Sequence, residues 1–337
     1  MFIVIEGADG SGKSSLIAEI KSQIQARFPE RTITEFHKGK PEEETLRWVL
    51  NEYAISIEKQ DWTSRLAIAD RWHWGEVTYA PIKRPHTCND SYGLLGRSGW
   101  RWVELFLMSR GVAQFWLYQP LEVLIERINS RGDDFVNTDE LARVLEYYSF
   151  GAGATARLAG KIQPHPYNFN DVGEIATEII NKAERIAEAS AKLAEYPEYI
   201  GAPNPTALIV GDQRNVTLKY GNETILPFMP VNSNSGDFLL SSIPHTVWKQ
   251  YGIVNANEFY GSRLFSLWDT LGRPRIVALG RMAEKGLLLS GIESRNMTVM
   301  PHPQYVKRFH HYDKKAYGAA IAAAAAEGRA EESWTLR

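Results

Sequence analysis

In the first half of the chain, segments with the apolar pattern of a β-strand alternate with segments whose apolar residues recur at the spacing of an α-helix. Short apolar or alternating runs predict strands over residues 2–5, 31–36, 66–69 and 112–118. Between them, apolar residues recur at helical spacing, as Leu16, Ile20 and Ile24 do. This spacing predicts helices over residues 14–28, 42–58, 102–110, 121–129, 138–150 and 174–195, with a loop over 81–99. Strands that alternate with helices predict a parallel α/β sheet covered on both faces.

A proline-rich segment follows the last of these helices. Pro197, Pro203 and Pro205 fall within ten residues, which no helix can continue through. The α/β pattern then restarts, with strands expected over 207–210, 253–254, 275–279 and 296–300 and helices over 237–251, 282–289 and 313–327. We therefore expect a first domain over 1–196, a linker over 197–205, a second three-layer α/β domain over 206–327, and a frayed tail over 328–337.

Composition narrows the class of protein. The chain has 337 residues, 44% of them hydrophobic, which is enough for two globular cores. The net charge of -2 excludes polyanion binding by bulk charge and leaves a local basic patch open. A single cysteine, Cys88, excludes an intramolecular disulfide and a cysteine-based zinc site. The N-terminus lacks signal-peptide features and no apolar run reaches ~18 residues, so we expect a cytoplasmic protein (host cytoplasm if viral) without a membrane partner.

A glycine-rich loop joins the first strand to the first helix. Gly7, Gly12, Lys13 and Ser14 match GxxxxGK[ST] in the strand–loop–helix context that this motif requires. Its backbone N–H groups would face a triphosphate, Lys13 would reach the β- and γ-phosphates, and Ser14 would ligate Mg²⁺. The sequence thus predicts ATP and Mg²⁺ as cofactors, held by Gly7, Asp9, Gly10, Ser11, Gly12, Lys13, Ser14 and Ser15.

Two segments resemble thymidylate kinases and related nucleotide kinases of the P-loop class. EGADGSGKSS, residues 6–15, is similar to their opening loop, and the resemblance implies that Asp9 lies near the acceptor's sugar or phosphate. The alternative is that Asp9 only caps the loop. LAIADRWHWGEVTY, residues 66–79, resembles their DRY-like segment. Asp70 would end a buried strand, where a carboxylate can order the magnesium shell or accept the acceptor's proton, and Arg71 would hold a phosphate. The alternative is an Asp–Arg pair that closes the strand end.

The residues after Arg71 have two interpretations each. Trp72, His73 and Trp74 either wall the acceptor pocket or belong to the core. Glu76 is either a second acid in contact with substrate or an ordinary residue at the start of a helix.

ERINSRGDDF, residues 126–135, resembles the lid of nucleoside monophosphate kinases. Arg127 and Arg131 occupy the matching positions and share a helix face at i and i+4, so they would neutralise transition-state charge. The alternative is a solvated basic face, and Asp133 and Asp134 are expected to cap the next turn. Residues 45–59, TLRWVLNEYAISIEK, depart from the thymidylate kinase pattern because Arg47 is the only arginine there. A thymine-reading helix is therefore not expected.

Four later segments resemble the uracil-DNA glycosylase superfamily in order. They are VGDQRN at 210–215, VNANEF at 254–259, IVALGRMAEKGL at 276–287 and MPHPQYVKRF at 300–309. The resemblance implies that His302 stabilises charge on a base carbonyl and that Asp212 belongs to the substrate loop, which here lacks the family's proline. We expect this domain to bind a nucleotide or DNA, with a flipped base. Lys307, Arg308, His310 and His311 would contact phosphates, or form a solvated loop.

Four functions are compatible with these features. The first is an ATP-dependent kinase for a pyrimidine deoxynucleotide in DNA, similar to bacteriophage 5-hydroxymethyluracil DNA kinases. The second is a free deoxynucleoside monophosphate kinase with an accessory nucleic-acid-binding domain. The third is a DNA glycosylase with an ATP-binding module, and the fourth a binding module that uses ATP as a switch. The Asp70–Arg71 pair and the lid arginines favour a kinase, and the second domain favours the first function. The acceptor and the oligomeric state stay open.

Overall fold

The computed structural model divides into two compact units. The first comprises Met1–Gly96 and Gly111–Ala191, and the second Arg97–Arg110 and Lys192–Arg337. The structure describes residues 1–55, 57, 66–88, 90, 92–132, 136–155, 172–212, 226–230, 235–259, 261–309 and 313–326. Across this part of the chain, no helix has both the length and the hydrophobicity to cross a membrane.

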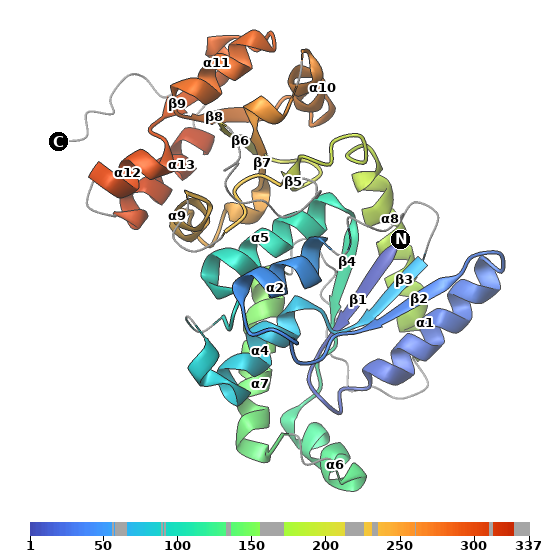
Figure 1. The fold of residues 1–337 in the computed structure, drawn as a ribbon. Helices are drawn as coiled ribbons and strands as arrows, with labels where there is room; N and C mark the ends of the chain where they lie inside the picture. Colours follow the sequence, from blue (N-terminus) through green and yellow to red (C-terminus); the bar gives the residue numbers. More distant parts are fainter. Residues whose placement is uncertain are drawn as a thin grey trace. The chain divides into compact units, whose positions relative to one another are not determined.

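The first unit is built on a four-stranded parallel sheet (Figure 1). Its strands are β1 (Phe2–Glu6), β2 (Ile33–His37), β3 (Leu66–Asp70) and β4 (Val112–Trp116), in the order β2-β3-β1-β4. The four predicted strands are therefore confirmed. Because the strands are parallel, their carboxyl ends meet at one edge, where Ile5 and His37 both pair with Asp70. Ligands of open α/β sheets bind outside this edge.

Helices complete the first unit. One face of the sheet shares a core with α1 (Lys13–Arg27) and α8 (Val172–Ala191), where Ile20, Ile24 and Ile179 are buried. The other helices are α2 (Leu46–Leu50), which continues into a π-helical turn at Asn51–Ile55, α4 (His73–Lys83), α6 (Leu121–Arg131) and α7 (Thr138–Thr155). The helix expected over 42–58 is thus shorter and irregular in the described residues.

The second unit contains a five-stranded sheet with the order β5-β7-β6-β8-β9. The strands are β5 (Ile200–Gly201), β6 (Ala207–Gly211), β7 (Tyr251–Asn255), β8 (Arg275–Leu279) and β9 (Met297–Met300). All neighbours are parallel except β5, which pairs antiparallel with β7. The mixed α/β architecture expected from the sequence is confirmed.

Helices lie on both faces of this second sheet. α10 (Arg263–Thr270) and α11 (Arg281–Leu289) share a buried core with Leu208, Val210 and Ile276. On the other face, α13 (Lys314–Ala326) contacts β6, β8 and α9 (Ser235–Ser242), which also contacts α12 (Pro303–Phe309). The helix expected over 237–251 ends instead at Ser242, and α10 was not expected.

Helix α5 (Gly96–Ser109) differs most from the expectation. The sequence predicted a loop over 81–99 and a helix from 102, because proline and glycine are frequent there; in the structure Pro81 lies within α4, and α5 begins at Gly96. The fully buried Arg101 donates from Nη1 to the carbonyl oxygens of Leu240 (2.6 Å) and Ile243 (2.7 Å), the last turn of α9 and its exit. Residues 97–110 therefore group with the second unit, which differs from the expected domain of residues 1–196.

Candidate functional site

The glycine-rich loop leaves β1 in a conformation that requires glycine. A Cβ on Gly7 would lie 2.6 Å from the carbonyl oxygen of Leu117, and Gly12, at the N-cap of α1, has a φ of 95°. An L side chain is strongly disfavoured at both positions. The loop thereby places its backbone at the carboxyl edge of the sheet and at the amino end of α1, the arrangement that binds phosphate.

Lys13 lies across the inside of this loop. Its side chain is 6% exposed, and Nζ donates to the carbonyl oxygens of Gly7 (3.0 Å) and Ala8 (2.8 Å). Nζ is also 4.0 Å from Oδ1 of Asp70. Burial and the nearby Arg71 lower the pKa of Lys13 to about 8. Phosphate oxygens would offer this ammonium stronger, charge-assisted acceptors than the two carbonyls do.

The two residues expected to ligate Mg²⁺ present oxygen atoms. Ser14 is exposed in the first turn of α1, and Asp70 ends β3 with its Oδ1 buried and without a hydrogen-bond partner among the described residues. These hard oxygen donors fit Mg²⁺, which proteins bind through one or two carboxylates together with substrate phosphates. In the same described part of the chain, no group of three or more His, Cys, Asp and Glu side chains could hold a metal by itself. His37 ends β2 with Nδ1 3.5 Å from Asp70 Oδ2.

Asp9, Arg71 and Tyr79 form a polar cluster beside the loop. Arg71 has a φ of 65°, and its Nη2 donates to Asp9 Oδ1 and to the Tyr79 hydroxyl (3.3 Å). The Tyr79 hydroxyl in turn donates to Asp9 Oδ2 (2.9 Å). Burial alone would raise the pKa of Asp9, but the Arg71 charge and hydrogen bonds outweigh it, so this pKa is lowered. The cluster fixes an arginine next to the phosphate loop, and Tyr79 was not identified from the sequence.

Glu6 lies under the loop and was also missed. It is fully buried at the end of β1, and its Oε1 accepts the N–H of Trp72 at 2.9 Å. Burial raises the pKa of Glu6 to about 8, although the Trp72 N–H and the Arg71 and Lys13 charges oppose this rise. This hydrogen bond and that of the Arg71 N–H to Ile5 O (3.0 Å) hold the turn after β3 in the strained conformation of Arg71. The available signal was an acidic residue ending an otherwise apolar strand.

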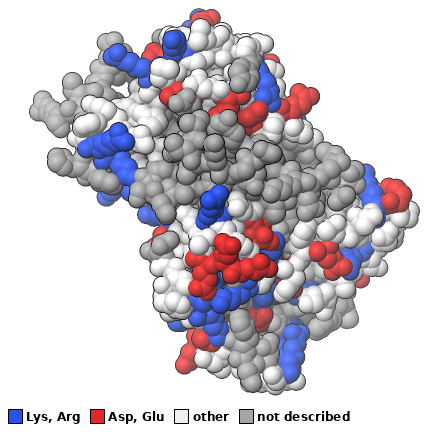
Figure 2. Space-filling view, in the orientation of Figure 1, with Lys and Arg blue, Asp and Glu red and all other residues white. Residues whose placement is uncertain are grey.

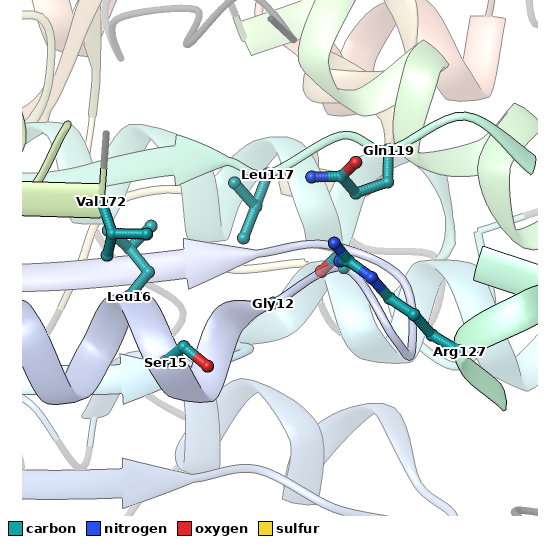
Figure 3. A pocket seen from close by; sticks show the side chains of 8 residues that line it. Gly12, Ser15, Leu16, Leu117, Gln119, Arg127 and Val172 are labelled. Carbon is teal, nitrogen blue, oxygen red and sulfur yellow. The ribbon is translucent and has the colours of Figure 1, made fainter. Parts of the chain in front are cut away.

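Of the two arginines predicted to form a lid, Arg127 reaches the glycine-rich loop. It extends from α6, and Nη1 donates to Gly10 O at 3.0 Å. Figure 3 shows its side chain at the edge of a pocket beside the loop, lined by Ser11, Gly12, Ser15, Leu16, Leu117, Gln119, Arg127 and Val172. Arg131 is exposed at the last residue of α6. Asp133 and Asp134 lie outside the described residues.

The tryptophans after Arg71 lie in the core, which corrects the alternative that they wall the acceptor pocket. Trp72 and Trp74 are 1% and 0% exposed, and the Trp72 indole N–H donates to Tyr53 O at 2.9 Å. His73 is likewise fully buried. Glu76 is also buried, and its Oε2 accepts from Arg84 Nη2 at 2.5 Å. Trp72 and Glu76 are therefore core residues of the first unit.

A second set of polar residues meets at the carboxyl edge of the second unit's sheet. A Cβ on Gly211, which ends β6, would lie 2.5 Å from the Phe228 ring and 2.6 Å from Asn255 Oδ1. Asn255 ends β7 and is 2% exposed. The Phe228 ring and the Asn255 amide therefore converge beside Asp212. The Asp212 Oδ1 accepts a hydrogen bond from Asn257 Nδ2 at 2.9 Å. Asn255 and Phe228 were missed, although VNANEF places an asparagine after an apolar run. Gln213, Arg214 and Asn215 lie outside the described residues.

His302 lies at the same edge. A Cβ on Gly280, which follows β8, would lie 3.3 Å from His302 Cβ. The His302 Nδ1 accepts the N–H of Gln304 at 3.2 Å. In a neutral ring, this contact places the proton on Nε2. Burial lowers the pKa of His302, against a smaller opposing effect of the Asp212 charge. In the neutral tautomer that the Gln304 contact favours, Nε2 can donate a hydrogen bond. His310 and His311 lie outside the described residues.

Comparison with known proteins gives structural similarity but no family. No family model matches the chain, and no curated protein sequence matches it. Among solved structures, the YorR protein from Bacillus subtilis in complex with phosphorylated GDP is similar at 19% identity and a TM-score of 0.40, over 55% of this chain and 96% of that one. A deoxyadenosine kinase from M. mycoides, with bound dCMP and dCDP, is similar at 14% identity and a TM-score of 0.37, over 54% and 99%. These scores are too low to assign an activity.

Proposed function

We propose that the chain is an ATP- and Mg²⁺-dependent kinase. One observation carries the proposal: Lys13 of α1, the Asp70–Arg71 pair at the end of β3 and Arg127 of α6 all lie at the glycine-rich loop. Two or more cations beside a phosphate loop fit phosphoryl transfer, in which charge builds up on the phosphoryl oxygens. ATP binding as a mere switch would not need this set.

The acceptor we propose is a pyrimidine deoxynucleotide, specifically the hydroxymethyl group of 5-hydroxymethyl-dU in phage DNA. The acceptor oxygen would attack the γ-phosphorus of ATP, the bond to the β-phosphate oxygen would break, and the hydroxyl proton would pass to a base, for which Asp70 is the candidate. Lys13 and Arg127 would hold the phosphates, and Arg71 with Asp9 would orient the acceptor. Ser14 would hold Mg²⁺, which supplies charge neutralisation to the phosphates; Asp70 is the alternative magnesium ligand if it is not the base.

The second unit supports a base in DNA over a free nucleotide. Asn255 offers both a donor and an acceptor, which match the imide edge of uracil, and the Phe228 ring offers a stacking face. The Nε2–H of His302 could donate to a base carbonyl, and we call Asn255, Phe228 and His302 together the proposed base pocket. A free deoxynucleoside monophosphate kinase with an accessory domain is the second candidate. A glycosylase ranks lower because VGDQRN lacks the proline of the resembling family's water-activating loop.

A transfer assay with labelled ATP tests the proposal. The protein is incubated separately with DNA containing 5-hydroxymethyl-dU, unmodified DNA of the same sequence, and free deoxynucleoside monophosphates, and the products are separated after digestion. We expect label only in the modified DNA, and none with Lys13→Ala. Lys21→Ala, on the exposed side of the same helix and paired with Glu35, is the control and should retain activity. Label found only in free diphosphates would refute the DNA acceptor, and full activity of Lys13→Ala would refute the kinase site.

A further inference from the structure

Helix α12 of the second unit exposes two aromatic rings side by side. Tyr305 and Phe309 are 52% and 65% exposed, and their ring centroids are 5.1 Å apart at an interplanar angle of 43°. Pro303 and Val306 face the core. Contiguous exposed apolar surface marks interaction sites more often than single exposed residues do. The exposed residues of this helix, which we call the α12 stripe, are Gln304, Tyr305, Arg308 and Phe309.

The α12 stripe follows directly on His302, a residue of the proposed base pocket. The N–H groups of Tyr305 and Val306 donate to His302 O at 2.9 and 3.2 Å, and Gln304 N–H donates to its ring. The helix is therefore anchored to the residue that lines the proposed base pocket. At 1.5 Å per residue, Tyr305 and Phe309 lie about 5 and 10 Å along the helix from His302. Successive nucleotides in a stacked strand are ~3.4 Å apart, so the rings span two or three of them.

Charge on the stripe points to a polyanion. Arg308 is exposed between the two rings in sequence, and the preceding Lys307 is partly exposed. The chain as a whole has a net charge of -2, and Figure 2 shows acidic and basic side chains mixed over the face drawn. Long-range attraction to DNA is therefore weak, and affinity must come from local stacking and a few phosphate contacts. A purely apolar protein partner would not need the arginine.

We propose that the α12 stripe is a stacking platform for unpaired nucleotides of the DNA strand, next to the base that enters the pocket at His302. Tyr305 and Phe309 stack on base faces, and Arg308 contacts the intervening phosphate. Stacking of this kind needs exposed base faces, so the ligand is single-stranded or locally unpaired DNA. This inference rests on DNA being the acceptor in the proposed function.

Binding of a labelled oligonucleotide to the full-length protein tests the platform. Fluorescence anisotropy with single-stranded DNA of about 12 nucleotides gives the Kd over a range of salt concentrations. We expect Tyr305→Ala/Phe309→Ala to weaken binding by roughly 30-fold or more. Tyr305→Phe, which retains the ring, should bind like the wild type. Arg308→Ala should lower the slope of log K against log salt by about 0.7, the value for one phosphate contact to a single strand.

The matched control is a second exposed apolar pair in the same unit. Leu288 and Leu289 on α11 are 45% and 77% exposed, and Leu288→Ala/Leu289→Ala should leave DNA binding unchanged. Wild-type affinity in the aromatic double variant would overturn the platform. So would light scattering that shows a wild-type dimer lost in that variant with DNA affinity unchanged, since a second copy would then cover the stripe.

Failure of the inference can be separated from failure of the proposed function. If the wild type phosphorylates modified DNA and the aromatic double variant does so with the same KM, only the platform is wrong. If the wild type neither binds nor phosphorylates DNA but phosphorylates free deoxynucleotides, the DNA acceptor is wrong and the platform with it. Lys13→Ala should bind DNA normally, because it alters only the phosphate loop.

Discussion

Glu6 should make the stability of the first unit depend on pH, and Glu6→Gln should remove that dependence. In the folded protein the pKa of Glu6 is about 8, against 4.5 in an exposed carboxyl. The folded state therefore binds more protons than the unfolded state between these two values. The stability contributed by the protonated form is complete below about 4.5 and is lost as the pH rises through about 8.

The size of the effect follows from the two pKa values of Glu6. A pKa of about 8 in place of 4.5 corresponds to a loss of up to about 5 kcal/mol in the free energy of unfolding. Lys13 affects the free energy of unfolding between pH values of about 8 and 10.5. Its pKa is lowered from 10.5 to about 8, so the folded state binds fewer protons than the unfolded state between these values. Its effect raises stability as the pH increases above about 8. Without ATP, the two groups together predict a stability minimum near pH 8.

Urea unfolding at pH values from about 5 to about 9 measures this dependence, with hydrogen exchange of β1–β4 peptides isolating the first unit. A glutamine at position 6 can still accept the Trp72 N–H and carries no charge. We expect Glu6→Gln to be no more stable than the wild type near pH 5 and more stable above pH 8. Glu140→Gln is the control, because its hydrogen bond from Lys83 lowers the pKa and its effect should be constant over this range. Parallel curves for the wild type and Glu6→Gln would refute the reasoning.

Two further predictions test the contacts around the site and helix α5. Tyr79→Phe removes the hydroxyl that donates to Asp9, a loss of about 1 kcal/mol that should raise the KM for the acceptor several-fold and leave the KM for ATP unchanged in steady-state kinetics. A change in the KM for ATP alone would contradict the placement of this cluster on the acceptor side. Arg101→Met leaves the carbonyls of Leu240 and Ile243 without their donor and should destabilise the second unit by about 2–4 kcal/mol in urea unfolding. Arg97→Met, exposed on the same helix, should change stability by less than about 0.5 kcal/mol, and equal losses would refute the capping role.

Most strands were predictable because they are short apolar runs, whereas β2 was predictable from its alternation of apolar and polar residues. All five residues of β1, β4 and β6 are buried, so no alternation was needed to identify them. Helix α10 was missed although Leu264, Leu267 and Trp268 recur at i, i+3 and i+4. A helix of eight residues gives only two turns of that period, which is too short to stand out from the surrounding loops.

The site was predictable only where one local motif held it. The loop and the Asp70–Arg71 pair are contiguous in sequence, so the positions of Lys13 and Arg71 followed from the motif and the end of a strand. Glu6, Tyr79 and His37 depend on other contacts: the register that sets His37 beside Asp70, and the fold of α4 that brings Tyr79 to Asp9. Asn255 and Phe228 are far apart in sequence, and both lie against Gly211 in the folded chain. A pattern along the chain cannot show which strand ends are neighbours.

Helix α5 shows why the domain partition could not be derived from strand and helix order. Its sequence lies between α4 and β4 and has the apolar content that a helix of the first sheet would have. Its contacts within the second unit come from residues far along the chain: the Arg101 guanidinium donates to α9, the Trp102 indole N–H donates to Pro227 O at 2.9 Å, and the Trp100 ring packs against Trp248. Pro227 precedes Phe228 of the proposed base pocket. A truncation after Ala191 would therefore expose Arg101 and Trp102 on the remaining chain, and a chain starting at Lys192 would lack the donor that holds this loop. Activity tests of either unit alone would measure a damaged protein, so the acceptor has to be established on the full chain.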